Sequence, residues 1–313
     1  MPRWSSRRLA GMLVAAAAVA VASTLAAAWS ASPSGTGLQA RVRTVLRGTG
    51  GREVSASMVA PILREAVVAT EDERFYHHHG IDIIGVLRAL PYDLTHLSLA
   101  QGASTITEQV AKRLFLGGND HDPWRKLEDA AVALKLENRY DKEQILTAYL
   151  NSAYFGAGTY GVWAASRHYF GLRPSQLDTS QASLLAGLPQ APSAYDPLVH
   201  PEAGRDRQID VLRAVRNGYL TEEEATAALA QPLHLASGAT LPPVRGIDLA
   251  PGPAFLWWQF ALGSALALAG TVALVALRLP RLRIPHGLIA LRIASLLILL
   301  LGIGTAIRAF RTA

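Results

Sequence analysis

Carboxylates, an arginine and three histidines gather in the ten-residue segment from Glu71 to Gly80. A carboxylate held beside a reacting hydroxyl can remove its proton as a new bond forms, so this segment is a candidate for general acid–base catalysis. If the segment is helical, Glu71, Arg74 and His78 share one face, because they lie three and seven positions apart. An acidic helix start would explain Glu71 and Asp72 equally well. The consecutive histidines do not favour zinc, since adjacent helical side chains point in different directions, and we expect hydrogen-bonding roles for them.

Two basic segments further along the chain could hold phosphate groups. Residues 101–113 run from glycine through hydroxylated side chains to Lys112, an array that can bind phosphate through hydroxyls, backbone amides and basic side chains. A capped helix with a solvated basic end is the alternative for this segment. Arg125 and Asp129 then lie one helical turn apart beside Lys126, which suits either a pyrophosphate site or a surface ion pair.

These segments and two later ones resemble the five ordered motifs of glycosyltransferase family 51, the peptidoglycan polymerases. The first motif, Glu-Asp-x-x-Phe-x-x-His-x-Gly, is matched at Glu71, Asp72, Phe75, His78 and Gly80. The second, Gly-x-Ser-Thr-Ile-Thr-Gln-Gln followed by Ala-Lys, is matched at Gly102, Ser104, Thr105, Ile106, Thr107, Gln109, Ala111 and Lys112. The third, Arg-Lys-x-x-Glu, is matched at Arg125 and Lys126, and the fourth, Ile-Leu-x-x-Tyr-Leu-Asn, at Ile145, Leu146, Tyr149, Leu150 and Asn151. The fifth resembles the segment from Leu184 to Ser193, followed by Tyr195-Asp-Pro197.

The chain departs from the family pattern at three positions. Asp129 stands where the third motif has glutamate, Glu108 replaces the first glutamine of the second, and Gln181 replaces a usual glutamate of the fifth. Aspartate shortens the reach by one methylene, roughly 1.5 Å, which would lower the rate about a hundredfold if the carboxylate must meet a reacting atom. The neighbouring Glu128 points about 100° away on a helix and is not expected to substitute. Glu108 adds negative charge near a site expected to hold pyrophosphate.

The resemblance implies an inverting hexosyl transfer. The 4-hydroxyl of a lipid-linked disaccharide-peptide attacks the anomeric carbon of a growing glycan strand, and polyprenyl pyrophosphate leaves as a β-1,4 bond forms. By resemblance Glu71 is the base, and Asp129 is a second catalytic carboxylate that holds the acceptor or orients the cations. The implied substrate-binding residues are Asp72, Arg74, Phe75, His78, Gly102, Ser104, Thr105, Thr107, Gln109, Lys112, Arg113, Arg125, Lys126 and Asn151. Similar enzymes often use a divalent cation, so Mg²⁺ or Mn²⁺ is a candidate cofactor, with no metal ligand assigned.

The elements that must position these residues lie between two apolar ends. The 313-residue chain carries 17% charged residues, against about 25% in an ordinary soluble domain. After a basic start, the uncharged run from Leu9 to Ser32 would span roughly 36 Å as a helix, enough to cross a bilayer. We therefore predict a cytoplasmic tail and N-terminal membrane anchor over residues 1–32, with a cleaved signal peptide as the alternative.

Two further apolar segments, residues 254–277 and 287–310, are predicted transmembrane helices, and the basic loop 278–286 lies between them. Basic loops stay on the cytoplasmic side, so the middle of the chain is expected outside. The predicted location is the bacterial cytoplasmic (inner) membrane, multi-pass, with the catalytic domain on the external or periplasmic side. The net charge of +6 suits anionic lipids and pyrophosphate. Nucleic acid is not expected as a partner, because the arginines cluster beside apolar segments.

The middle of the chain is predicted to form one all-α domain over residues 61–235, between linkers at 33–60 and 236–253. Its apolar periodicity is helical, without a convincing run of alternating strand residues. The resemblance implies that this domain is lysozyme-like, with a smaller membrane-facing region that takes the lipid. The chain has no cysteine, which excludes disulfides and thiolate metal sites.

Local signals indicate where helices of this domain begin. Asp141 with Gln144, and Asp178 with Gln181, have the spacing of capping boxes, in which each side chain bonds the other residue's backbone amide. Pro123 follows an aspartate, which is typical of the first position of a helix.

Two other functions remain open from the sequence. A lysozyme-like lytic transglycosylase would share the lone catalytic glutamate, but cleaving glycan involves no pyrophosphate and needs no array of cations. A degenerate membrane scaffold could bind the lipid-linked precursor or cell-wall synthesis partners without turnover, and the three departures favour it. No Ser-x-x-Lys region follows residue 230, so a separate transpeptidase is expected to crosslink the strands.

Overall fold

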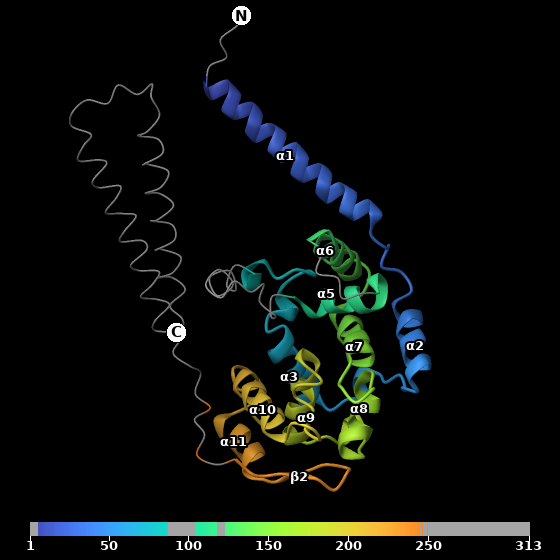
Figure 1. Ribbon diagram of the computed structural model, residues 1–313, viewed down its shortest axis with the longest axis vertical. Helices are drawn as coiled ribbons and strands as arrows, with labels where there is room; N and C mark the ends of the chain where they lie inside the picture. The colour runs from blue at the N-terminus through green and yellow to red at the C-terminus, as the bar shows by residue number, and fades with distance from the viewer. Residues whose placement is uncertain (1–5, 87–103, 118–122, 245, 247–248, 250–313) are drawn as a thin grey trace, which may run out of the picture. The chain divides into compact units, whose positions relative to one another are not determined.

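The computed structural model describes residues 6–249 except 87–103, 118–122, 245 and 247–248 (Figure 1). Within this range, the side chains of residues 6–14 and of Pro123 are not described. The predicted spans 254–277 and 287–310 and the loop 278–286 lie outside the described residues.

The described part is mostly helical, as predicted. Its α-helices are α1 (Ser6–Ala31), α2 (Leu38–Thr49), α3 (Pro61–Glu71), α5 (Ile106–Ala111), α6 (Pro123–Glu137), α7 (Lys142–Ser152), α8 (Gly161–Phe170), α9 (Thr179–Gly187), α10 (Pro201–Arg216) and α11 (Glu222–Ala230) (Figure 1). Short 3₁₀ turns are η1 (Ala56–Met58), η2 (Phe75–His77), η4 (Pro174–Gln176) and η5 (Leu188–Gln190), and a π-helical turn, η3 (Lys112–Leu116), extends α5. An antiparallel hairpin, which was not predicted, pairs β1 (Leu233–His234) with β2 (Thr240–Leu241).

The predicted helix starts are confirmed. At α7, Asp141 accepts from the Gln144 amide at 2.8 Å, while Gln144 Oε1 accepts from the Asp141 amide at 3.1 Å. The same reciprocal bonds join Asp178 and Gln181 at the start of α9. Because either glutamine or glutamate can fill the third position of a capping box, Gln181 keeps this bond. Helix α6 begins at Pro123 as predicted.

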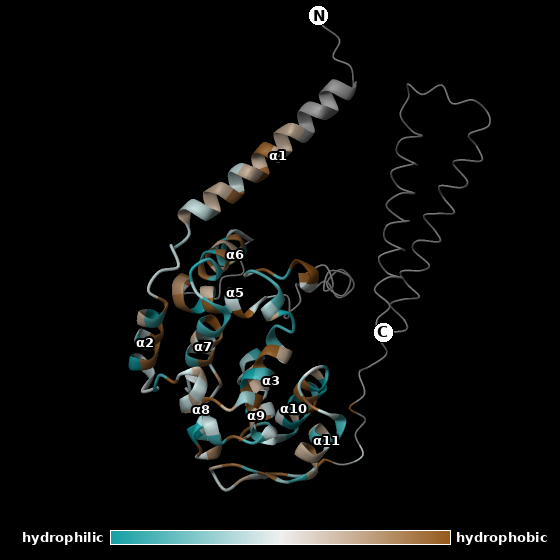
Figure 2. Cartoon of the chain, turned by 180° about the vertical axis from the view of Figure 1, so that it is seen from behind, coloured by the Kyte–Doolittle hydropathy of each residue, from teal (hydrophilic) through white to brown (hydrophobic). Residues whose placement is uncertain are grey.

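The prediction of a linker over residues 33–60 is wrong, because α2 lies within it and packs against α7. Leu38, Val42 and Leu46 recur every four residues on one face of α2, and all three are buried. The helix carries both hydrophilic and hydrophobic positions, as expected of a half-buried helix (Figure 2). Val54 and Val59, beyond the helix, are also buried in the main core.

The boundary predicted at residue 235 is also wrong, because the described residues of the segment 236–253 contribute to the domain. Its strand β2 pairs with β1, and Leu241 and Leu249 are buried. The amide of Val244 donates to the carbonyl of Leu229 at 2.8 Å. The prolines of this segment had suggested a linker, yet its described residues pack on the helical domain.

The core brings together helices that are distant in sequence. Helix α3 packs against α9 and α10, whereas α5 packs against α6 and α7. Phe75 and Tyr149 are among the largest fully buried side chains of this core. The three chemically promising segments are the end of α3, helix α5 and helix α6. The fold places the end of α3 and helix α6 beside α5.

Helix α1 is joined to α6 by Lys135. The Lys135 ammonium donates to the carbonyl of Trp29 at 2.6 Å and to the carbonyl of Ser32 at 2.9 Å. Among the residues that the structure describes, no helix is both long enough and apolar enough to cross a membrane. The anchor over residues 1–32 stays a prediction.

Candidate active site

Glu71 is the last residue of α3 and is only partly buried. The Gln109 amide of α5 donates to Glu71 Oε2 at 2.7 Å, and Arg113 Nη2 donates to Gln109 Oε1 at 3.0 Å. The Arg113 guanidinium also lies over the ring of Tyr149, 5.0 Å from its centre. Three elements thus fix the carboxylate of Glu71 while leaving part of it accessible.

Tyr149 is a neighbour of Glu71 that the sequence assigned to the fourth motif but not to the site. Burial, followed by the negative charge of Glu71, raises the pKa of the Tyr149 hydroxyl. Its hydroxyl, a polar group beside the apolar Ile145 and Leu146 of the same motif, was the available signal.

The prediction that Glu71, Arg74 and His78 share a helix face is wrong. Helix α3 ends at Glu71, and Asp72 leaves the helical conformation. Its carboxylate accepts from the Ile106 amide at 2.9 Å and from His78 Nε2 at 2.9 Å, which draws the first motif onto the start of α5. A helical Asp72 could not reach both donors.

Arg74 and Phe75 also have partners within the fold. Arg74 Nε lies 3.3 Å from Asp82 Oδ1, and Phe75 is fully buried. His78 is buried against Asp72, in the hydrogen-bonding role expected for the histidines. These contacts of Arg74, Phe75 and His78 shape the loop after Glu71.

The start of α5 is held by a capping box that includes the unusual Glu108. Thr105 Oγ1 accepts from the Glu108 amide at 3.1 Å, and Glu108 Oε2 accepts from the Thr105 amide at 2.9 Å. Thr105 Oγ1 also donates to the carbonyl of Gly80 at 2.6 Å. Glu108 Oε1 lies 3.1 Å from Lys126 Nζ, which in turn donates to Ser104 Oγ at 2.8 Å. Glu108 thus pairs with one of the cations assigned to pyrophosphate.

Asp129 is 7% exposed, and its Oδ1 is buried without a hydrogen-bond partner among the described residues. Burial, with the negative charge of Glu108, raises the pKa of Asp129 to about 6. The positive charges of Lys126, Lys112 and Arg125 act in the opposite direction. The carboxyl therefore lies among the cations that the third motif and the end of α5 supply.

Arg125 pairs with Glu128 and not with Asp129. Its Nη1 lies 3.3 Å from Glu128 Oε2, so the ion pair expected between Arg125 and Asp129 is not formed. The Nε of Arg125 and the Nη1 of Arg113 are buried without a hydrogen-bond partner in the described part of the chain. Both guanidinium groups therefore keep one buried donor that no described residue satisfies.

Two other predicted substrate-binding residues lie apart from these groups. Asn151 is 1% exposed; its Oδ1 accepts from the Val54 amide and its Nδ2 donates to the Val54 carbonyl, both at 2.8 Å. Thr107 is fully buried and donates to Glu137 Oε1 at 2.6 Å. The assignment of Asn151 and Thr107 to substrate binding is not supported, because their polar groups hold the fold together. Gly102 lies outside the described residues.

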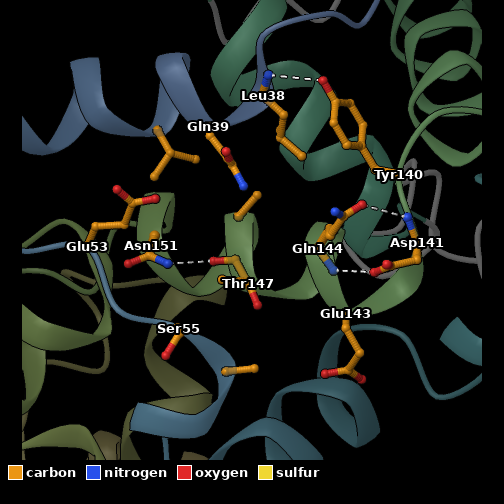
Figure 3. Close-up of a pocket in the computed structure, with 13 residues that line it drawn as sticks. Leu38, Gln39, Glu53, Ser55, Tyr140, Asp141, Glu143, Gln144, Thr147 and Asn151 are labelled. Carbon is orange, nitrogen blue, oxygen red and sulfur yellow. Dashed lines mark hydrogen bonds between the residues drawn. The ribbon is translucent and has the colours of Figure 1, made fainter.

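A pocket of about 240 Å³ lies between α2 and α7, in a different place from these groups (Figure 3). Its lining includes Leu38, Gln39, Gln144 and Asn151, but neither Glu71 nor Asp129. We therefore assign the chemistry to the groups around α5 and not to this pocket. In the described residues no group of three or more histidine, aspartate or glutamate side chains could hold a metal ion.

Comparison with known proteins identifies relatives for about half of the chain. The family model described as Transglycosylase matches residues 40–216. A protein of Cupriavidus necator named as a transglycosylase is 45% identical over 55% of this chain and 74% of its own. Penicillin-binding protein 1F of Bacillus subtilis is 41% identical over 58% of this chain, and penicillin-binding protein 1A of Aquifex aeolicus is 42% identical over the same share. The chain matches only 26% and 25% of the length of these two penicillin-binding proteins. The crystal structure of penicillin-binding protein 1A from Haemophilus influenzae is 23% identical, with a TM-score of 0.36 over 59% of this chain and 18% of that one.

Proposed function

Because this chain belongs to the transglycosylase family, we propose that it is a peptidoglycan glycosyltransferase that polymerises lipid-linked disaccharide-peptide into β-1,4 glycan strands and releases polyprenyl pyrophosphate. The observation that carries the proposal is the geometry at α5. A carboxylate, Glu71, is held at one side of this helix, and the cations Lys112, Arg113 and Lys126 lie at its end and along its neighbour. Base and cations are the two components that glycosyl transfer from a pyrophosphate requires.

Glu71 is the proposed base. The sugar 4-hydroxyl is a weak nucleophile, and it gains reactivity when its proton passes to the carboxylate as the glycosidic bond forms. The bond from Gln109 fixes the orientation of the carboxylate before the substrate binds. The Arg113 guanidinium binds Gln109 and so couples the position of the base to the cationic end of α5.

The leaving pyrophosphate carries negative charge that must be stabilised as the bond to the anomeric carbon breaks. Arg113 and Arg125 each keep a buried nitrogen without a hydrogen-bond partner among the described residues, and we propose these nitrogens as donors to the phosphate oxygens. Lys112, in the π-helical turn, adds positive charge near Asp129. A Mg²⁺ or Mn²⁺ ion also remains a proposal. The described residues provide no dedicated ligand set for it.

Membrane attachment is part of the proposal, because the substrate is lipid-linked. The anchor over residues 1–32, the two C-terminal spans and an external domain on the bacterial cytoplasmic membrane follow from the apolar runs and basic flanks of the sequence. Reporter fusions after residue 60 and near residue 245 should both give external signals, and a fusion at Arg281 should give a cytoplasmic one. A cytoplasmic signal near residue 245 would exclude this orientation.

The deciding experiment supplies the purified chain with labelled lipid-linked disaccharide-peptide and measures the length of the products. Long glycan strands from the wild type, and none from Glu71→Gln, would support a polymerase. Products that shorten pre-formed glycan would instead indicate a lytic transglycosylase.

A non-catalytic scaffold is the second candidate, and one observation favours it. Glu108 pairs with Lys126, which reduces the positive charge available to pyrophosphate. A scaffold would bind the labelled precursor without making glycan, and Glu71→Gln would not change that binding.

A further inference from the structure

Two buried carboxyl groups compete for one ammonium at the contact between α5 and α6. Glu108 of α5 is 5% exposed, Asp129 of α6 is 7% exposed, and the two helices pack against each other. Lys126 Nζ lies 3.1 Å from Glu108 Oε1, and Lys126 precedes Asp129 by three positions on the same helix. The ammonium is therefore committed to Glu108, although it neighbours both carboxyl groups.

The hydrogen bonds of the two carboxyl groups are unequal. Glu108 Oε2 accepts from the Thr105 amide at 2.9 Å while its Oε1 pairs with Lys126. Glu108 therefore has a partner for each of its two carboxyl oxygens. Asp129 Oδ1 is buried with no hydrogen-bond partner in the part of the chain that the structure describes, which disfavours a charged carboxylate there. When two carboxyl groups lie close together in a buried site, the one with the better partners keeps the negative charge.

We infer that Glu108 is a positioning residue that holds the negative charge of this pair, so that Asp129 enters the reaction as a carboxylic acid and donates a hydrogen bond to a diphosphate oxygen. This inference rests on the proposed function of the site. A carboxylate in the place of Asp129 would repel the diphosphate, whereas a carboxylic acid offers it a donor. The proton stays on Asp129 Oδ throughout, and no covalent bond to either residue forms.

Other charged groups surround Asp129 and act on its ionisation. On α6 they are Arg125 and Lys126, and from α5 and its π-helical extension they are Glu108 and Lys112. The three cations favour ionisation, yet burial and Glu108 outweigh them and raise the pKa of Asp129 to about 6. A bound diphosphate brings further negative charge, which raises the pKa again and holds the proton at neutral pH.

The titration of Asp129 can be measured without any assay of turnover. Carboxyl ¹³C NMR of the full chain labelled at aspartate gives the pKa, and Asp129→Asn assigns the resonance. In the wild type Asp129 should titrate near pH 6. In Glu108→Gln the midpoint should fall by about one pH unit or more, because a like charge has been removed. Glutamine still accepts from the Thr105 amide, so the capping box is kept and only the charge changes.

Two further variants test the direction and the locality of the effect. Lys126→Met removes a cation that favours ionisation, so it should move the Asp129 midpoint to higher pH. Glu224→Gln is the matched control, because Glu224 forms the same capping box with Thr221 on α11, which packs against α9 and α10. It should leave the Asp129 midpoint unchanged.

The pH dependence of polymerisation provides the functional arm. In Glu108→Gln the loss of rate toward alkaline pH should begin about one pH unit lower than in the wild type, since Asp129 loses its proton earlier. An Asp129 resonance that titrates near pH 4 like an ordinary aspartate, or one that does not move in Glu108→Gln, would overturn the inference. A wild type that makes no glycan would refute the proposed function, and the NMR titration would still decide whether Glu108 controls Asp129.

Discussion

Glu71→Gln removes the proposed base while keeping its shape. In the structure Gln109 Nε2 donates to Glu71 Oε2 at 2.7 Å, and the carbonyl of a glutamine at position 71 can accept the same bond. The substitution exchanges a charge-assisted hydrogen bond for a neutral one, so the loss of folding free energy should stay near 1 kcal/mol. General base catalysis contributes at least about a hundredfold, so the fall in kcat should correspond to about 2.7 kcal/mol or more.

The assay compares initial rates of glycan formation over a range of lipid-linked precursor concentrations. We expect kcat to fall by at least about a hundredfold and KM to stay within a few-fold, because the amide still fits the site. Thermal unfolding of the same sample checks that the fold is retained. A Glu71→Gln variant with a kcat close to that of the wild type would refute the assignment of the base.

Gln109 provides a graded test of the same reasoning. Gln109→Ala leaves the Glu71 carboxylate in place but removes the bond that orients it, which should lower kcat about tenfold. Gln181→Ala is the matched control, because this glutamine bonds Asp178 in the capping box of α9. Equal losses of kcat in the two variants would mean that the effect comes from stability and not from orientation of the base.

Three other expectations concern Asp129, Asn151 and Lys135. Asp129→Ala should abolish glycan formation. Asp129→Asn should stabilise the domain at pH 7 by up to about 3 kcal/mol, because the raised pKa of Asp129 makes the wild-type domain less stable as the pH rises from about 4 to about 6. In urea unfolding this gain should vanish below about pH 4. Asn151→Ala leaves the buried amide and carbonyl of Val54 without partners and should lower the free energy of unfolding by about 3 kcal/mol, while a raised KM with unchanged stability would contradict the structural role. Lys135→Met removes the bonds to Trp29, so proteolysis between α1 and α2 should be about tenfold faster, and an unchanged cleavage rate would show that Lys135 does not hold α1.

Local chemistry in the sequence was enough to locate several helices and to identify the motifs. The starts of α7 and α9 depend on side chains and amides within four residues, so the pairs Asp141–Gln144 and Asp178–Gln181 could be predicted before any packing was known. The carboxylate of Glu71 was likewise found from its motif. These features are decided by neighbours in the chain.

The elements that the sequence misassigned depend on partners far along the chain. Residues 38–49 were predicted to be part of a linker, although their apolar spacing is regular. They form helix α2 because a short helix becomes stable when its apolar face packs against another element, here α7. Asn151 was predicted to bind substrate because it belongs to the fourth motif. In the fold its side-chain oxygen instead accepts a hydrogen bond from the amide of Val54, 97 positions away in the chain.

Glu108 shows most clearly what only the tertiary structure decided. From the sequence it was an added negative charge near pyrophosphate, with no indication of its partners. The packing of α5 on α6 brings it to Lys126 and places Asp129 nearby, so that Glu108 is paired while Asp129 Oδ1 has no hydrogen-bond partner among the described residues. Whether a carboxyl group is ionised depends on burial and on charges within a few ångströms, and those distances are set by helix packing and not by the order of residues in the chain.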